Sequence, residues 1–192
     1  NAVKENKDTK LSTLDLSIND VNRLGAEPVA AMLAVTTSLT AGATAEDNKT
    51  IGIAAEIFST LTVANLLYNN LDKDSVAMLT KIATEKKMSL CGIGPDQGSA
   101  NFFEAGLTPI DSILIASDLN VRTSLTSIDI SHNQLCGVNS IGGGGGGTFT
   151  TEAIDKLCDT LKSDACKITT LRCMHAFSGL EGDHHPQVHA CI

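Results

Sequence analysis

Hydrophobic and polar residues follow one recurring eleven-residue pattern along this chain. The clearest copy, at residues 125–135 (LTSIDISHNQL), has apolar residues at positions 1, 4, 6 and 11 and asparagine at position 9. Two further copies begin at residues 11 (LSTLDLSINDV) and 61 (LTVANLLYNNL), the second with Ala64 at a core position. We expect each copy to form a short strand whose positions 1, 4 and 6 enter a shared core. The asparagine can then hydrogen-bond backbone groups in the turn that follows the strand.

Three weaker copies begin at residues 39, 88 and 168. Some of their core positions hold small or polar residues, or their position 9 lacks asparagine. Neighbouring strands should be parallel, because successive coils of a repeat array share one polarity. Leaving out the copy at residue 39, the pattern predicts strands near residues 13–16, 63–66, 89–93, 126–130 and 169–172.

The stretches between these copies carry helix signals. Pro28 can be an early helical residue, and Asp72 precedes apolar residues at helical spacing. Thr108, followed by proline, opens a third helix, and Thr150 or Thr151 opens a fourth. Each unit therefore reads strand, turn, helix. This order predicts an α/β solenoid with parallel strands on its concave side and helices on its convex side.

The spacing of the units divides the chain into a polar leader at residues 1–10, a repeat region at 11–176 and an atypical tail at 177–192. Insertions at residues 95–107 and 136–149 interrupt the repeat region. A repeat array needs polar caps at its ends. We therefore expect the chain to be either a fragment of a longer array or an array covered at its ends by other subunits.

Six consecutive glycines occupy residues 142–147 in the second insertion. They resemble the glycine half of a phosphate-binding loop, but Thr148 stands where that motif has lysine. A flexible insertion is the favoured interpretation, and placeholders for undetermined residues are the alternative.

Composition narrows the function classes. The net charge is −8, which argues against a nucleic-acid surface, and the absence of tryptophan argues against stacking platforms. The longest apolar-looking uncharged stretch, residues 28–45, is broken by serine, threonine and glycine, so we expect no transmembrane segment. The sequence contains no complete cofactor motif, so we expect no cofactor. The six cysteines form no C-x-x-C pair and are typical of an intracellular protein, cytoplasmic or plastid.

Part of the chain resembles a known family. Residues 89–97 (SLCGIGPDQ), 113–119 (ILIASDL), 125–138 (LTSIDISHNQLCGV) and 148–157 (TFTTEAIDKL) carry this likeness, together with the copy at residue 61. They resemble the ribonuclease-inhibitor-like subgroup of leucine-rich-repeat proteins, and are similar to the long repeat arrays of unicellular algae. The resemblance implies a horseshoe-shaped solenoid used as a protein-interaction surface or scaffold, with no catalytic residues to carry over.

In such a solenoid, positions 3, 5, 7 and 8 of each copy face the concave side or its rim. Exposed apolar clusters with a polar rim often mark interaction sites. In the alternative interpretation, Leu67 and Leu90 pack against each other or against an inserted loop. The predicted protein-binding surface has an apolar centre and charged flanks: Val63, Leu67, Tyr68 and Leu90, with Asp15, Asp129 and Arg172.

The tail holds the only group of possible metal ligands, His184, His185, His189 and Cys191. Pro186 works against a helix that presents two of these histidines together, and a second ligand cluster is absent from the sequence. We therefore favour a solvated tail with no metal. The sequence predicts a non-catalytic protein-binding or scaffold module. The alternatives are a peripheral structural subunit of a larger, possibly plastid, complex and, less favoured, a metal-binding protein.

Overall fold

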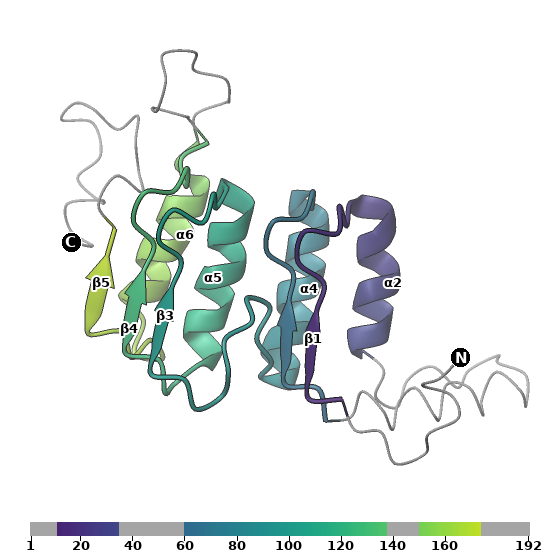
Figure 1. Ribbon diagram of the computed structural model, residues 1–192, viewed down its shortest axis with the longest axis horizontal. Coiled ribbons are helices and arrows are strands. Elements are labelled where there is room, and N and C mark those ends of the chain that lie inside the picture. Colours follow the sequence, from purple (N-terminus) through teal and green to yellow (C-terminus); the bar gives the residue numbers. More distant parts are fainter. Residues whose placement is uncertain (1–10, 35–59, 138–149, 174–192) are drawn as a thin grey trace, which may run out of the picture.

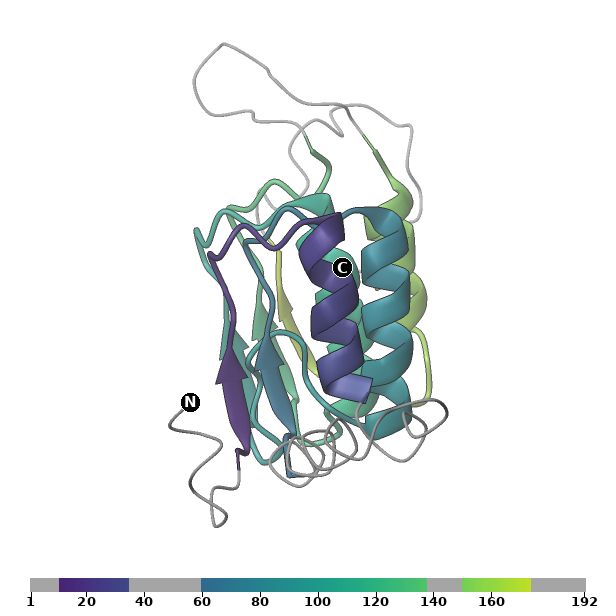
Figure 2. The ribbon, with the colours of Figure 1, turned by 90° about the vertical axis from the view of Figure 1, so that its right-hand side faces the viewer.

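The structure, a computed structural model, describes residues 11–34, 60–137 and 150–173. These residues form a mixed α/β arrangement in two layers, with short parallel strands on one side and helices on the other (Figure 1). Figure 2, turned by 90°, shows the two layers edge on. In chain order the elements are β1 (Thr13–Asp15), α2 (Arg23–Ala34), β2 (Val63–Asn65), α4 (Lys73–Lys86), β3 (Ser99–Asn101), α5 (Pro109–Val121), β4 (Ser127–Asp129), α6 (Glu152–Leu161) and β5 (Thr170–Arg172).

The strands form two sheets, β1–β2 and β3–β4–β5, and every pairing within them is parallel. The predicted parallel polarity is therefore confirmed for these strands. Position 3 of one copy lies opposite position 3 of the next, as in the pairs Thr13–Val63 and Ser127–Thr170. The predicted copy at residue 39 lies outside the described residues, and β1 pairs directly with β2.

The expected insertion at residues 95–107 contains a strand instead. Ala100 of β3 lies opposite Ile128 of β4, so this segment is a further copy of the pattern that begins at Gln97. Polar Gln97 at position 1 and Ala105 at position 9 hide it in the sequence. Leu107, at position 11, is fully buried as the pattern requires.

The strand predicted at residues 89–93 is wrong. This segment makes only two isolated bridges to β2, Val63 with Ser89 and Asn65 with Cys91. The first bridge places Leu90, and not Cys91, beside the core residue Ala64, one residue away from the expected register. Residues 88–98 thus separate the two sheets, and we call them the sheet break.

Three of the four helices in the described part begin where the sequence indicates. The Asp72 side chain accepts a hydrogen bond from the backbone N–H of Ser75 (2.8 Å), and Thr108 forms a reciprocal capping box with Asp111. Thr151 is the residue before α6. Asp72 and Thr108 thus supply acceptors for N–H groups that have no partner inside a helix, whereas the Thr151 side chain makes no capping hydrogen bond.

The start of α2 differs from the prediction, because Pro28 lies inside this helix and not at its beginning. Asn22 precedes the helix, and its side chain accepts a hydrogen bond from the N–H of Leu24 (3.0 Å). Asparagine is among the best helix-capping residues, so Asn22 is the signal that the sequence analysis overlooked.

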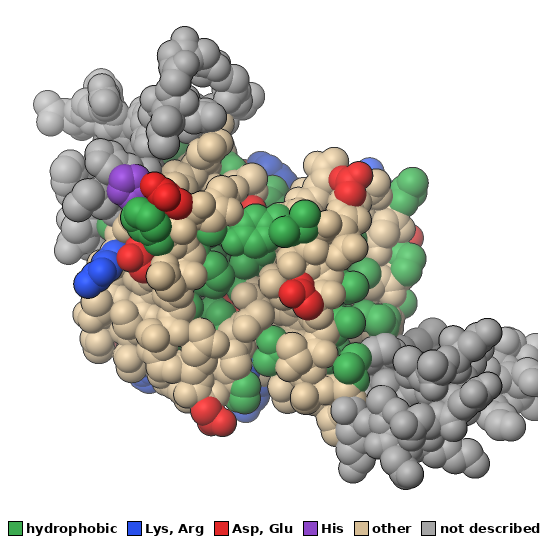
Figure 3. Space-filling view, viewed as in Figure 1, with side chains coloured by type: hydrophobic (Ala, Val, Ile, Leu, Met, Phe, Trp, Pro, Cys, Tyr) green, Lys and Arg blue, Asp and Glu red, His purple; other side chains and the backbone are tan. Residues whose placement is uncertain are grey.

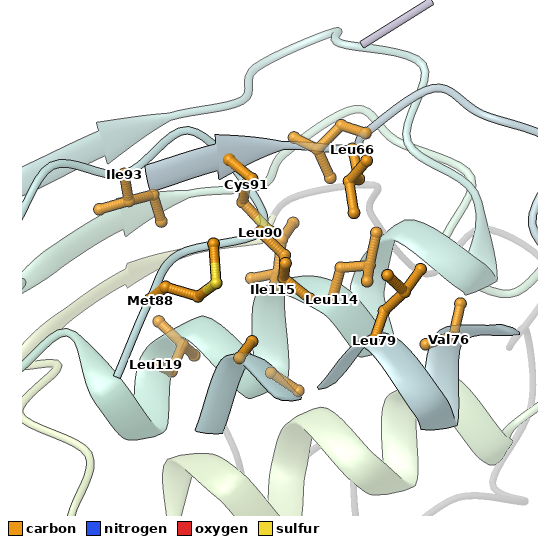
Figure 4. Close-up of a cluster of buried hydrophobic side chains, with 14 of the residues drawn as sticks. Leu66, Val76, Leu79, Met88, Leu90, Cys91, Ile93, Leu114, Ile115 and Leu119 are labelled. Atoms are coloured by element: carbon orange, nitrogen blue, oxygen red, sulfur yellow. The ribbon is translucent and has the colours of Figure 1, made fainter. Parts of the chain in front are cut away.

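The core lies between the two layers. Side chains from β2, the sheet break, α4 and α5 meet there, among them Leu66, Leu79, Leu90 and Leu114 (Figure 4). Apolar burial of this kind is the main stabilising term in folding. None of the helices among the described residues is long and apolar enough to cross a membrane.

The core position of Ile128 can be tested by substitution. Ile128 is almost fully buried in β4, whereas its near neighbour Thr126 is exposed. We expect Ile128→Asp to lower the free energy of unfolding by more than about 3 kcal/mol, because it buries an unpaired charge. Thr126→Asp should change it by less than about 0.5 kcal/mol. Urea unfolding of both variants measures the difference, and equal midpoints would contradict the assigned register.

Candidate interaction surface on the strand face

A short polar side chain holds the turn after four of the strands. In the copies that contain β1 to β4, position 5 is aspartate or asparagine, and its side chain accepts a hydrogen bond from the N–H two residues later. Such local bonds stabilise turns in place of backbone pairing. The bonds join Asp15 to Ser17 (2.9 Å), Asn65 to Leu67 (3.2 Å), Asn101 to Phe103 (2.9 Å) and Asp129 to Ser131 (2.9 Å).

The residue directly after this N–H donor, at position 8, has a left-handed backbone in each of the four turns. Position 8 has a φ of 56° at Ile18, 61° at Tyr68, 51° at Glu104 and 57° at His132. None of these residues is glycine, although this conformation is unfavourable for residues with a side chain. The same turn geometry therefore recurs in four copies whose residues at this position differ in chemistry.

Asparagine at position 9 joins neighbouring copies. The Asn133 side chain donates to the carbonyls of Phe102 (2.7 Å) and Ile130 (2.9 Å) and accepts from the N–H of Leu107 (2.9 Å). Asn69 makes the equivalent bonds between β2 and β1. The expected role of this asparagine is confirmed, and it extends to the turn of the preceding copy.

Two buried carboxylates of α5 satisfy backbone groups beside the sheet break. Asp111 accepts from the N–H of Tyr68 (3.0 Å), in the turn after β2. Asp118 accepts from the N–H groups of Leu90 (2.8 Å) and Cys91 (3.1 Å) and from the hydroxyl of Ser89. These N–H groups have no strand to pair with, so α5 supplies the acceptors that a neighbouring strand would supply elsewhere.

Burial raises the pKa of Asp118 to about 6, while hydrogen bonds from Ser89, Leu90 and Cys91 and the charge of Arg122 oppose the rise. Arg122 is itself almost completely buried and donates to the carbonyl of Thr62 (2.5 Å). Burial, followed by the charge of Asp118, also raises the pKa of the Cys91 thiol well above its usual value. This thiol is therefore unreactive at neutral pH.

The predicted apolar centre of the binding surface lies mostly inside the protein. Val63, Leu67 and Leu90 are all buried, and the last two belong to the main hydrophobic core. Leu90 is buried because the one-residue register shift turns it inward. This burial corrects the expectation that the three side chains are exposed on the binding surface.

The other predicted site residues lie on the strand face. Tyr68 is half-buried, and burial, with Asp111 and Cys91 nearby, raises the pKa of its hydroxyl. Arg172 is exposed on β5 directly opposite Asp129. Burial opposes ionisation of Asp129, but the hydrogen bonds from Ser131 and the charges of Arg172 and His132 outweigh it and lower its pKa. Asp15 and Asp129 also stabilise the turns that follow their strands, through the hydrogen bonds to Ser17 and Ser131.

The sequence analysis missed an aromatic pair on this face. The ring of Phe103, which is 47% exposed, lies 5.0 Å from the ring of His132, and the two planes are tilted by 56°. Phe103 was overlooked because it follows β3, inside the expected insertion. Its signal was the spacing of Ala100, Phe102 and Leu107, which fits positions 4, 6 and 11.

The possible metal ligands His184, His185, His189 and Cys191 lie outside the described residues. Within residues 11–34, 60–137 and 150–173, no group of three histidine, cysteine, aspartate or glutamate side chains could hold a metal ion.

Comparison with known proteins adds no family assignment. No protein-family model matches the chain, and no curated protein matches it significantly.

Asn133 and Asn19 occupy the same pattern position with different bonding. The Asn19 side chain donates only to the nearby carbonyl of Ser17 (2.8 Å) and is exposed. Asn133→Ala should lower the free energy of unfolding by about 2–3 kcal/mol, because buried carbonyls lose their donor. Asn19→Ala should lower it by less than about 1 kcal/mol. Thermal unfolding of both variants measures this order, and the reverse order would contradict the bridging role.

Asp118→Ala should destabilise the sheet break. It leaves the hydroxyl of Ser89 and the N–H groups of Leu90 and Cys91 without their acceptor, at an expected loss of more than about 2 kcal/mol in urea unfolding. Asp159→Ala, at an exposed position of α6, is the matched control and should change stability by less than about 0.5 kcal/mol. A neutral effect of Asp118→Ala would exclude the anchoring role.

The pH dependence of stability provides a further test of Asp118. Its pKa of about 6 lies above its usual 3.8, so the folded chain holds this proton more tightly than the unfolded chain. The contribution of Asp118 to the free energy of unfolding should fall by up to roughly 3 kcal/mol as the pH rises from about 4 to about 6. Urea unfolding across this range should show the fall in the parent protein and not in Asp118→Ala. If the free energy of unfolding varied with pH in the same way in both proteins, the predicted contribution of Asp118 would be wrong.

Proposed function

We propose that this chain is a leucine-rich-repeat solenoid that serves as a non-catalytic protein-binding or scaffold module. The observation that carries the proposal is the repetition of one turn. Four copies combine a position 5 side chain that closes the turn with a left-handed residue at position 8. Parallel strands backed by helices at similar spacing support a repeat architecture. Such arrays present extended surfaces that suit protein partners.

The strand face of β3–β5 is the best candidate for the binding surface. Phe103 and His132 form an aromatic pair there, with Glu104, Asp129 and Arg172 around it. An exposed aromatic side chain with a charged surround has the composition of a protein–protein contact. The charges are of both signs, which favours a partner of mixed polarity near this pair.

A structural role in a larger assembly is the second candidate. Leu24 of α2 is 84% exposed and Ile18 is 78% exposed, and both lie at the N-terminal end of the described residues, in β1's turn and the helix that follows it. A neighbouring subunit seated on that end would cover them. This role would use the end of the array and the helix layer, and not the strand face.

One pair of variants separates the two candidates. The tagged full chain is recovered under native conditions, and the proteins bound to it are quantified by mass spectrometry. Phe103→Ser should reduce recovery of the main partner at least about tenfold, equal to about 1.4 kcal/mol, while Leu24→Ser leaves it unchanged. Both replace an exposed apolar side chain, so stability should be similar. Loss with Leu24→Ser alone would favour the structural subunit.

A further inference from the structure

The sheet break leaves one strand edge open in the middle of the strand layer. Residues 88–92 bond to β2, through the Ala64 N–H to Ser89 (2.8 Å) and the Gly92 N–H to Ala64 (2.9 Å). The N–H groups of Leu90 and Cys91 turn inward to Asp118, and those of Met88 and Ser89 bond to the carbonyls of Ala83 and Thr62. This segment therefore has no set of N–H groups directed at β3.

The edge of β3 that faces the break has unused backbone groups. The carbonyl of Gly98 and the N–H of Phe102 bond to the β4 chain, so the alternate residues Ser99 and Asn101 direct their backbone groups away from β4. The Ser99 carbonyl accepts from the Gln97 side chain (2.7 Å). Among the described residues, the Ser99 N–H and both backbone groups of Asn101 have no partner.

The side chains around this edge give it a charge preference. Figure 3 shows acidic side chains across the strand face and a band of hydrophobic ones between the two sheets. Tyr68, half-buried beside the break, is available for apolar contact. The lysines of the described helices belong to α4 and α6, in the other layer. The charged residues within the described strands are the acids Asp15 and Asp129 and the base Arg172, and the flanks of β3 add the exposed acids Asp96 and Glu104.

We propose that a short, extended, basic segment of a partner protein adds to the open edge of β3 at the sheet break. Its backbone bonds to Ser99 and Asn101, as in known cases where a peptide extends a sheet edge. Alternate side chains of an extended peptide point in opposite directions, so lysine or arginine at every second position can meet the acidic strand face while the others point toward the helix layer. This inference rests on the proposed protein-binding function and names the class of partner segment.

The probe is a fluorescent heptapeptide of alternating lysine and valine, capped at both ends and titrated into the full chain while anisotropy is recorded. The matched peptide with glutamate in place of lysine should bind at least about tenfold more weakly, because its charge matches that of the face. A lysine peptide with methylated backbone nitrogens should also bind at least about tenfold more weakly, because it cannot donate to the edge. Equal binding of the methylated peptide would overturn the proposal in favour of general charge attraction.

Two proline variants localise the contact. Ser99→Pro removes an N–H that points away from β4, and Thr13→Pro removes the corresponding N–H at the same pattern position of β1. Ser99→Pro should weaken binding of the lysine peptide at least about tenfold, and Thr13→Pro should leave it unchanged. Equal effects of the two variants, or none, would refute strand addition at β3.

A charge-reversed variant tests the proposed partner chemistry without changing the backbone of β3, and so can be used even if Ser99→Pro does not fold. In the double variant D96K/E104K, both changes are at exposed positions. It should lose affinity for the lysine peptide and gain affinity for the glutamate peptide, each by at least about tenfold. No change in preference would refute the proposed partner chemistry. If partner recovery depends on Phe103 while the peptide ignores Ser99 and these acids, the protein-binding function stands and strand addition is wrong.

Discussion

The pairing of backbone donors at the sheet break is the constraint on which the rest of the arrangement depends. Asp111 and Asp118 lie seven residues apart in α5, and so project from the same face of the helix. From that face they accept the N–H groups of Tyr68, Leu90 and Cys91, which no strand pairs. A hydrocarbon core alone could not hold this junction, because buried N–H groups without acceptors are strongly unfavourable. Helix α5 therefore packs behind the strand layer and also holds the junction between the two sheets through its hydrogen bonds.

Sequence reasoning succeeded where the signal is local. The strands that begin near residues 13, 63, 127 and 170 follow from apolar spacing, and the caps Asp72 and Thr108 follow from helix-start chemistry. It failed where a distant residue decides the outcome. The register at Leu90 depends on bonds to Asp118, 28 residues away, and no periodicity in residues 88–98 encodes them.

The sequence pattern predicted part of the candidate surface and missed the rest. The pattern placed Tyr68 and Arg172 on the strand face, because side chains alternate along a strand. The pattern could not predict that Val63 and Leu67 are buried. Their exposure depends on which segment lies beside the strand and not on the sequence of the strand itself. Phe103 was missed because its copy has Gln97 and Ala105 at two diagnostic positions. Position 1 can be polar there without disrupting the pairing of β3 with β4.

The left-handed residues at position 8 have a consequence for how such a surface can change. The turn constrains the backbone at this position and leaves the side chain open, since isoleucine, tyrosine, glutamate and histidine all occur there. The side chains that stabilise the turn belong to other positions, namely the aspartate or asparagine at position 5 and the asparagine at position 9. A substitution at position 8 therefore alters the chemistry displayed by one copy while the core and the junctions between copies keep their residues. The row of turn apexes is a place where new surface specificity can evolve one residue at a time.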